Sequence, residues 1–233
     1  MKSPRPGGRT PSQAPPRPAR QSTGPRKARA GRTRDRILAA ATELFAQQGF
    51  AAISVRDIAR QCGVNLPTIY HYFGGKDGLY DACYKATFEA AADALRTAIT
   101  EAPSAELRIR NFTVKLCEIF MRDHSFRRLL QREFLREEHR PIAALTTHHF
   151  DHEFRLLTAA IVELYGPEQS MERCFSIYGL ALGLILMRRI GELAGMNPSI
   201  GANAQLMADY VLGIVLPARS GGGGLARRAR RRP

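Results

Sequence analysis

The chain has 233 residues and a formal net charge of +14, a length that holds one ordinary domain or a small domain plus a larger one. Its longest apolar run, Ile177 to Met187, is far short of the roughly 20 residues that a membrane span requires. The first thirty residues lack the apolar segment of a secretory signal, so we expect a cytoplasmic protein without a membrane partner.

The positive charge lies in two tails. Residues 1–32 hold nine Lys and Arg and residues 219–233 hold six, with no acid in either tail, so the rest of the chain is close to neutral. The first tail is rich in proline and the second begins with a glycine run, and such compositions bury too little apolar surface to fold. We predict two disordered basic arms, of which the N-terminal one contacts DNA phosphates or the minor groove. The C-terminal arm is equally well a solvated charge run.

A first amphipathic helix is predicted from Thr33, which can cap it, to Gly49. Arg34 and Arg36 in its opening turns can contact phosphate or form an ordinary solvated face. The apolar face of this helix comprises Ile37, Leu38, Ala41, Leu44 and Phe45.

Two short helices around a tight turn follow. Ser54 with Asp57 three residues later is a capping-box signal, which predicts a helix from Ser54 to Gln61. Gly63 then supplies the positive φ that a sharp turn between helices needs.

Asn65 is the expected cap of the next helix, and Pro67 fixes its start because proline is tolerated only in the first turn. If Ile69 and Phe73 point into the core, the opposite face is small, polar and uncharged, which suits a helix laid in a major groove. The candidate DNA-binding residues of the whole motif are Ser54, Arg56, Asn65, Pro67, Thr68, Tyr70, His71, Tyr72 and Lys76.

Five short motifs lie along this part of the chain: Gly49-Phe50, Ile58-Ala59, Gly63-Val64, Tyr70-His71-Tyr72-Phe73 and Lys76-Asp77. Through these motifs, the segment from about Thr33 to Ala92 closely resembles the N-terminal domain of the TetR family of bacterial repressors. The resemblance implies a sequence-specific regulator that binds a double-stranded DNA operator as a homodimer and is released by a small-molecule effector. One departure is the glycine-rich step from Gly75 to Gly78, which leaves the start of the following helix undefined.

The remainder of the chain is predicted to be helical throughout. A helix from Asp77 to Thr100 joins two regions and is long enough to carry a movement between them. Later helices are predicted to begin at Ser104 and Ser125, and further ones to span Ile142–Tyr165, Glu168–Ala194 and Ile200–Leu216.

The last two predicted helices are apolar on more than one face, which favours a symmetric dimer through a four-helix bundle over a wholly intramolecular core. The candidate interface residues are Gly179, Gly183, Leu206, Tyr210 and Ile214.

The body also holds more aromatic and thioether side chains than a small bundle needs. A subset of them is predicted to line an effector cavity, with an ordinary core as the alternative. The candidates are Phe88, Phe112, Phe120, Met121, Phe134, Phe150, Phe154 and Tyr178.

Two other kinds of site are considered from the histidines and the cysteines of the sequence. His148 and His152 with Asp151 have the spacing of metal ligands on one helical face, which leaves a metal-dependent hydrolase as an alternative, although no metallopeptidase acid accompanies them. Four single cysteines without a C-x-x-C pair indicate reduced core thiols, with redox sensing as the alternative.

We therefore predict an all-α transcriptional regulator, not an enzyme and without a cofactor. Residues 33–80 form a three-helix DNA-binding domain, and residues 81–218 form a helical domain for effector binding and dimerisation. A further alternative is a basic protein that binds DNA without sequence preference.

Overall fold

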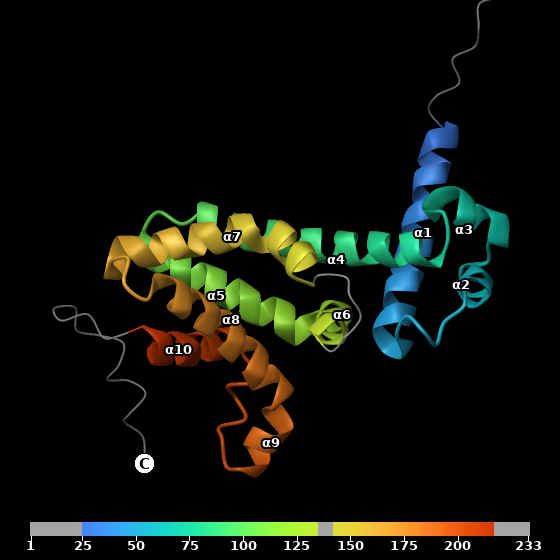
Figure 1. The fold of residues 1–233 in the computed structure, drawn as a ribbon. Coiled ribbons are helices and arrows are strands. Elements are labelled where there is room, and N and C mark those ends of the chain that lie inside the picture. The colour runs from blue at the N-terminus through green and yellow to red at the C-terminus, as the bar shows by residue number, and fades with distance from the viewer. Residues whose placement is uncertain (1–24, 135–141, 217–233) are drawn as a thin grey trace, which may run out of the picture.

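The computed structural model describes residues 25–134 and 142–216, and the side chains of residues 29–132 and 150–216. Within these ranges the chain is all α-helical, as predicted (Figure 1). In chain order the helices are α1 (Pro25–Gln48), α2 (Val55–Cys62), α3 (Leu66–Phe73), α4 (Lys76–Thr100), α5 (Ala105–Arg122), α6 (His124–Phe134), α7 (Ile142–Tyr165), α8 (Ser170–Leu186), α9 (Arg188–Leu193) and α10 (Ala204–Val215).

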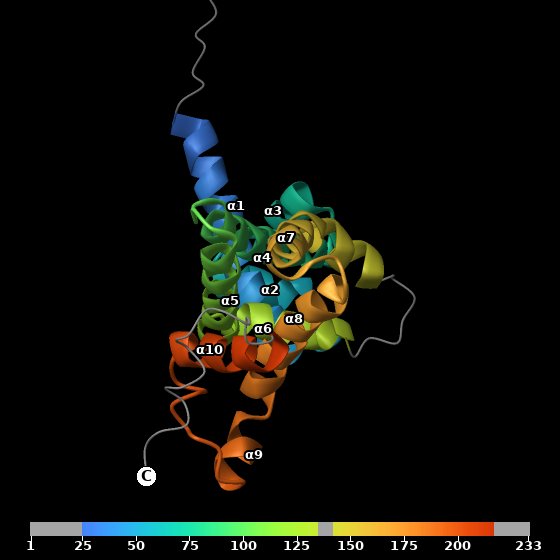
Figure 2. The ribbon, with the colours of Figure 1, turned by 90° about the vertical axis from the view of Figure 1, so that its left-hand side faces the viewer.

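Helix α4 connects the two ends of the molecule. It packs against α1 and α3 at its start and against α5, α6 and α7 further on, and its Phe88, Leu95 and Ile99 are almost completely buried. In the turned view, α5 and α7 lie beside α4, and α8 and α10 lie against α5 (Figure 2). None of the helices in the described ranges is long and apolar enough to cross a bilayer.

The first helix starts earlier than predicted, so the expectation that residues up to 32 are disordered is wrong for its last part. Helix α1 begins at Pro25, where a fixed φ and a missing N–H cost nothing in a first turn. Thr33 is not a cap, because its hydroxyl donates to the backbone carbonyl of Arg29 within the helix at 3.0 Å. Residues 1–24 and the predicted arm 219–233 lie outside the described residues.

Three later boundaries also differ from the prediction. Helix α10 begins at Ala204 rather than at Ile200, because the side chain of Asn203 caps it and accepts the N–H of Gln205 at 2.8 Å. The side chain that caps α6 is Asp123 rather than Ser125, since its carboxylate accepts the N–H of Phe126 at 2.8 Å. The single helix predicted for Glu168–Ala194 is two, because the backbone leaves the helical conformation at Met187 (φ −92°, ψ 5°). The boundaries of α2, α3, α4, α5 and α7 are confirmed to within about a residue.

The glycine-rich step between α3 and α4 has a specific geometry. Gly74 ends α3 in the left-handed region (φ 75°), and its N–H donates to the carbonyl of Tyr70 at 2.9 Å. Gly78 lies in the first turn of α4 directly against the backbone carbonyl oxygen of Phe73, so a Cβ there would fall far inside van der Waals contact. The close approach of α4 to the end of α3 therefore requires a glycine at this position.

We predict that Gly78→Ala lowers the free energy of unfolding by about 1–3 kcal/mol, because backbone must move to admit the methyl group. The matched control is Gly31→Ala in α1, where a Cβ meets nothing within 4 Å. That substitution should stabilise by about 0.5–1 kcal/mol through helix propensity. Urea unfolding of both variants tests this, and equal stabilities would contradict the close approach.

Candidate nucleic-acid interface

The start of α2 is fixed by a capping box, as predicted. The hydroxyl of Ser54 accepts the N–H of Asp57 at 3.2 Å, and the Asp57 carboxylate accepts the N–H of Ser54 at 3.2 Å. Hydrogen bonding from Ser54 lowers the pKa of Asp57, with a smaller contribution from Arg60. The Ser54 hydroxyl is thus committed to the cap in the free protein.

The turn to α3 follows the predicted pattern. Gly63 adopts the left-handed conformation (φ 61°), and the N–H of Val64 donates to the carbonyl of Ala59 at 3.0 Å. Arg36 of α1 donates to the carbonyl of Cys62 at 3.1 Å, which ties the end of α2 to α1. Arg36 therefore has a structural role. Its contact with phosphate stays a prediction.

Helix α3 presents the face that its spacing predicted. Ile69 and Phe73 are buried, whereas Pro67 and His71 on the other side are exposed. The carboxamide oxygen of Asn65 accepts both the N–H of Thr68, at 3.1 Å, and the Thr68 hydroxyl. The Thr68 hydroxyl is thus engaged in the helix cap in the free protein.

The remaining candidates surround this face. Arg56 and Tyr70 are exposed, and Tyr72 is half-buried with its ring 5.3 Å from that of His71. The ammonium group of Lys76 lies 4.4 Å from the centre of the Phe50 ring, which holds it at the start of α4. All nine predicted residues lie on α2, on α3 or at the helix ends next to them. Their roles in DNA binding stay predictions.

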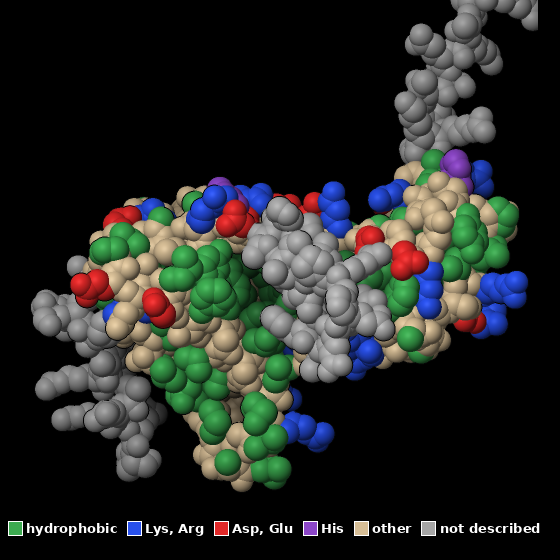
Figure 3. All heavy atoms as spheres, in the orientation of Figure 1, with side chains coloured by type: hydrophobic (Ala, Val, Ile, Leu, Met, Phe, Trp, Pro, Cys, Tyr) green, Lys and Arg blue, Asp and Glu red, His purple; other side chains and the backbone are tan. Residues whose placement is uncertain are grey.

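Sequence reasoning missed the helical form of the basic segment before the motif. Arg29 and Arg32 are exposed, and they lie on the first turns of α1, which project beyond the other helices (Figures 1 and 2). Several Lys and Arg side chains stand out on the N-terminal domain away from the body (Figure 3). Pro25 followed by good helix formers was the signal that could have revealed this extension.

The aromatic candidates for the effector site fall into two clusters. In the first, the ring of Phe88 lies 4.8 Å from Phe126 and 5.8 Å from Phe150, and Phe120 lies 6.0 Å from Phe126. Met121 is partly buried against the core, and the side chain of Phe134 lies outside the described residues. This first cluster joins α4, α5, α6 and α7.

The second cluster joins α5, α7 and α8. The ring of Tyr178 lies 5.8 Å from that of Phe112 and 6.0 Å from that of Phe154. Phe154 also contacts Phe175, at 4.9 Å. That either cluster lines an effector cavity stays a prediction.

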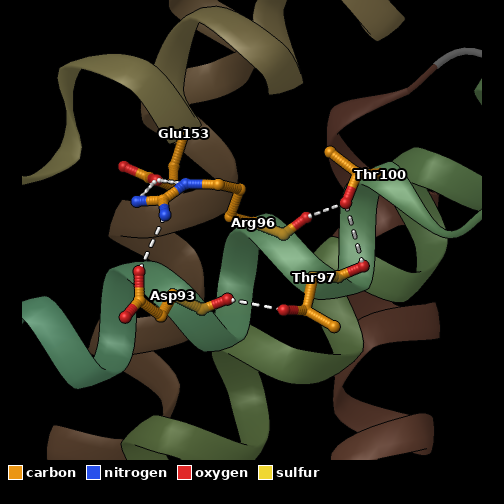
Figure 4. A network of polar contacts seen from close by, with 5 residues as sticks. All are labelled: Asp93, Arg96, Thr97, Thr100 and Glu153. Carbon is orange, nitrogen blue, oxygen red and sulfur yellow. Dashed lines mark hydrogen bonds and ion pairs between the residues drawn. The ribbon is translucent and has the colours of Figure 1, made fainter.

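An ion pair that the sequence did not reveal joins a partly exposed arginine of α4 to a buried glutamate of α7 (Figure 4). Arg96 binds Oε1 of Glu153 through Nε at 2.9 Å and through a terminal nitrogen at 2.8 Å, and its other terminal nitrogen binds Asp93 at 2.7 Å. The Glu153 side chain is completely buried, yet its second oxygen, Oε2, has no hydrogen-bond partner among the described residues. Leaving such an atom unbonded costs about 1–3 kcal/mol or more.

The hydroxyl of Tyr178 is also buried, without a hydrogen-bond partner in the described ranges. Burial raises the pKa of Tyr178 well above its ordinary value, with further increases from Cys174 and Glu153. The Tyr178 hydroxyl therefore stays protonated.

The predicted interface residues lie at the surface of a single chain. Leu206, Tyr210 and Ile214 on α10 are 45%, 41% and 56% exposed, although each is large and apolar. Gly179 is exposed and Gly183 half-buried on α8, and a Cβ at either would meet nothing within 4 Å. The projecting end around α8 and α9 carries many hydrophobic side chains (Figure 3).

The described residues give little support to a metal site or to redox-sensing thiols. Asp151 pairs with Arg155 at 2.6 Å, the side chain of His148 lies outside the described residues, and the described residues contain no group that could hold a metal ion. The four cysteines are buried and unpaired, as predicted. Burial raises the pKa of Cys83 to about 11 and those of Cys117 and Cys174 to about 12, so these thiols stay protonated.

The fold and this surface define a helix-turn-helix protein. The second helix of its motif is α3, which is joined to a larger helical body. Residues 37–83 match the model of bacterial regulatory proteins of the tetR family. Over these residues the chain is therefore similar to the DNA-binding part of the tetR family.

Individual relatives are similar to parts of the chain. The chain is 41% identical over 66 residues to the probable HTH-type transcriptional regulator YttP of Bacillus subtilis, covering 28% of this chain and 32% of that one. It is 30% identical over 120 residues to the HTH-type transcriptional repressor NicS of Pseudomonas putida, covering 50% and 55%. The matches thus span a third to about half of these relatives.

Among solved structures, the fatty acid degradation regulator FadR from Bacillus halodurans has a similar fold. The TM-score is 0.62 at 19% identity, and the match covers 79% of this chain and 98% of that one. At this identity the likeness shows the fold alone.

We predict that Thr68→Ala and His71→Ala each weaken binding to the preferred DNA site by about 1–3 kcal/mol and leave non-specific binding almost unchanged. Thr68→Ser keeps the hydroxyl that bonds Asn65 and loses only the methyl group, so it should behave like Thr68→Ala. Tyr70→Phe, Tyr72→Phe and Lys76→Ala should instead weaken binding to all sequences. Fluorescence anisotropy with specific and scrambled duplexes measures both, and wild-type affinities for all of these variants would show that α3 is not the reading helix.

Proposed function

We propose that this protein is a sequence-specific transcriptional regulator, acting as a repressor that a small-molecule effector releases from its operator. The observation that carries the proposal is α3, a short helix capped at both ends whose buried Ile69 and Phe73 leave Thr68 and His71 facing outward. Such a face fits the major groove and can contact base edges. The likeness to the repressor NicS supports repression rather than activation.

The first turns of α1 add the electrostatic part of binding. Arg29 and Arg32 lie one turn apart and are exposed, and Arg34 lies 5.5 Å from the Phe73 ring at the end of α3. A rigid helix that carries these charges next to the reading helix can follow the DNA backbone and neutralise phosphates.

The helical body is proposed to dimerise and to bind the effector. The exposed apolar faces of α8 and α10 bury each other when two copies pair, which places two reading helices on one operator. An effector bound between the helices of the body acts on α4, which packs against both α1 and α3. Such an effector can shift the equilibrium only by its different affinities for the two arrangements.

Genome-wide mapping of bound sites, followed by competition with unrelated DNA, tests the central claim. A single enriched motif that outcompetes unrelated DNA by about a thousandfold supports a specific regulator. Uniform occupancy and equal competition would favour the sequence-indifferent alternative.

We predict that Arg29→Ala with Arg32→Ala flattens the salt dependence of DNA binding. Each lost phosphate contact should reduce the slope of log affinity against log salt concentration by about 0.9. The control is Arg122→Ala, an exposed residue at the end of α5 in the body. If the double variant keeps the wild-type slope while it stays folded, α1 does not follow the backbone.

We predict that Leu206→Asp and Ile214→Asp each weaken dimerisation roughly a hundredfold, because a buried, unpaired carboxylate costs about 3 kcal/mol or more. Leu107→Asp is the control, since Leu107 is equally large and 41% exposed but lies on α5. Sedimentation velocity over a concentration series gives the result. A dimer that survives both α10 substitutions places the interface elsewhere.

A further inference from the structure

A side chain of the body holds the C-terminal end of α1. Arg132 of α6 donates from Nε to the backbone carbonyl of Ala46 at 3.3 Å and from a terminal nitrogen to that of Gln47 at 3.0 Å. The last turn of a helix leaves carbonyl groups without partners inside the helix, and the helix dipole places partial negative charge there. Since the last turn of α1 contains no basic residue of its own, the cation that satisfies it comes from another helix.

A glycine makes room for this contact. Gly49 follows α1 in the left-handed region (φ 88°), and its N–H donates to the carbonyl of Phe45 at 2.9 Å. A Cβ at Gly49 would lie 2.5 Å from a terminal nitrogen of Arg132 and 3.1 Å from its Cζ. A methyl group there would therefore displace the guanidinium group from the carbonyls that it binds.

The same turn also contacts the DNA-binding surface. Phe50 follows Gly49, and the ammonium group of Lys76 lies 4.4 Å from the centre of the Phe50 ring. Lys76 begins α4 and is one of the predicted DNA contacts. Arg132 of the body and Lys76 of the DNA-binding surface therefore contact neighbouring residues of one turn.

Arg132 adds a second attachment to the one that the chain itself provides. Helix α4 is the covalent link between the DNA-binding helices and the body, and α6 packs against both α1 and α4 (Figure 1). A single helical connection allows hinge motion, because a few terminal residues can absorb the change in φ and ψ. An attachment at the end of α1 opposes that motion.

We propose that Arg132 is a positioning residue that fixes the angle of the DNA-binding domain and thereby determines which half-site spacing the protein accepts. This inference rests on the proposed function, since it assumes that two copies of α3 bind one operator. One base pair inserted between the half-sites moves them about 3.4 Å apart and turns one against the other by about 35°. A domain held by α4 and Arg132 resists that change, whereas a domain held by α4 alone can follow it.

Distances between spin labels test the attachment without DNA. The labels are placed on full-length protein at Arg60→Cys in α2 and Arg155→Cys in α7, both exposed positions, whereas the native cysteines are buried. An excess of unlabelled protein restricts the measurement by double electron–electron resonance to distances within one chain. We expect a narrow distribution for Arg132 and a clearly broader one for Arg132→Met, which keeps an unbranched side chain and loses the guanidinium group.

Binding to DNA then tests the selectivity for spacing. Wild-type protein selects its best duplex from a random library, and fluorescence anisotropy compares this duplex with versions whose half-sites are one base pair closer or further apart. We expect wild-type protein to prefer the selected spacing about tenfold, because a mismatched spacing must be restored by deforming the duplex. Arg132→Met and Gly49→Ala should each reduce this preference to less than about threefold.

Two controls match these variants. Arg128→Met removes an exposed arginine from the same helix, so it causes the same loss of charge. Gly166→Ala places a methyl group on a glycine of similar φ (81°) in the body, where a Cβ meets nothing within 4 Å. Both controls should keep the narrow distance distribution and the wild-type preference. Gly49→Ala disturbs the contact from the side of α1, so it tests the proposal even if Arg132→Met does not fold.

Several outcomes would overturn the inference. They are an unchanged distance distribution in both Arg132→Met and Gly49→Ala, an unchanged preference for spacing in these variants, and equal losses in the two controls. Wild-type protein that selects no duplex, or a duplex with a single half-site, contradicts the proposed dimeric regulator and with it the role in spacing. The spin-label distances then still decide whether Arg132 holds the domain.

Discussion

The orientation of α3 depends on its packing against the start of α4. Ile69 and Phe73 anchor α3 in the core, and Gly78 allows α4 to touch the carbonyl of Phe73 directly. Close-packed interiors transmit displacement because they have few voids to absorb it. Any movement of the first turn of α4 must therefore move α3, and the same rigidity keeps the exposed face of α3 in one orientation.

The sequence predicted the parts of this arrangement that local rules decide. The caps at Ser54 and Asn65, the turn at Gly63 and the buried face of α3 follow from spacing and residue type, and the structure confirms them. The ion pair of Arg96 with Glu153 was not predictable, because 57 residues separate the two side chains and each looks like a surface residue of an amphipathic helix. The break at Met187 was missed because no proline or glycine marks it.

The body touches the DNA-binding end through a second contact besides α4. Arg132 of α6 donates to the carbonyls of Ala46 at 3.3 Å and Gln47 at 3.0 Å, at the C-terminal end of α1. A cation there satisfies carbonyls that the helix leaves unbonded and favours the negative end of its dipole. Helix α6 also packs against α4, so the body holds α1 through both α4 and α6.

The contacts of α4 with the rest of the body set the size of the coupling that a proposed effector could produce. Arg96 on α4 binds Glu153 on α7, and the Arg96 side chain is 43% exposed. Hydrogen bonds to charged groups contribute about 1.5–3 kcal/mol, and exposure of one partner reduces this contribution. Coupling between an effector and an operator is typically about 1–3 kcal/mol, which corresponds to roughly 5–150-fold in affinity. Loss of this one contact between α4 and α7 is therefore of the size that the proposed release from DNA requires, without a large rearrangement of the body.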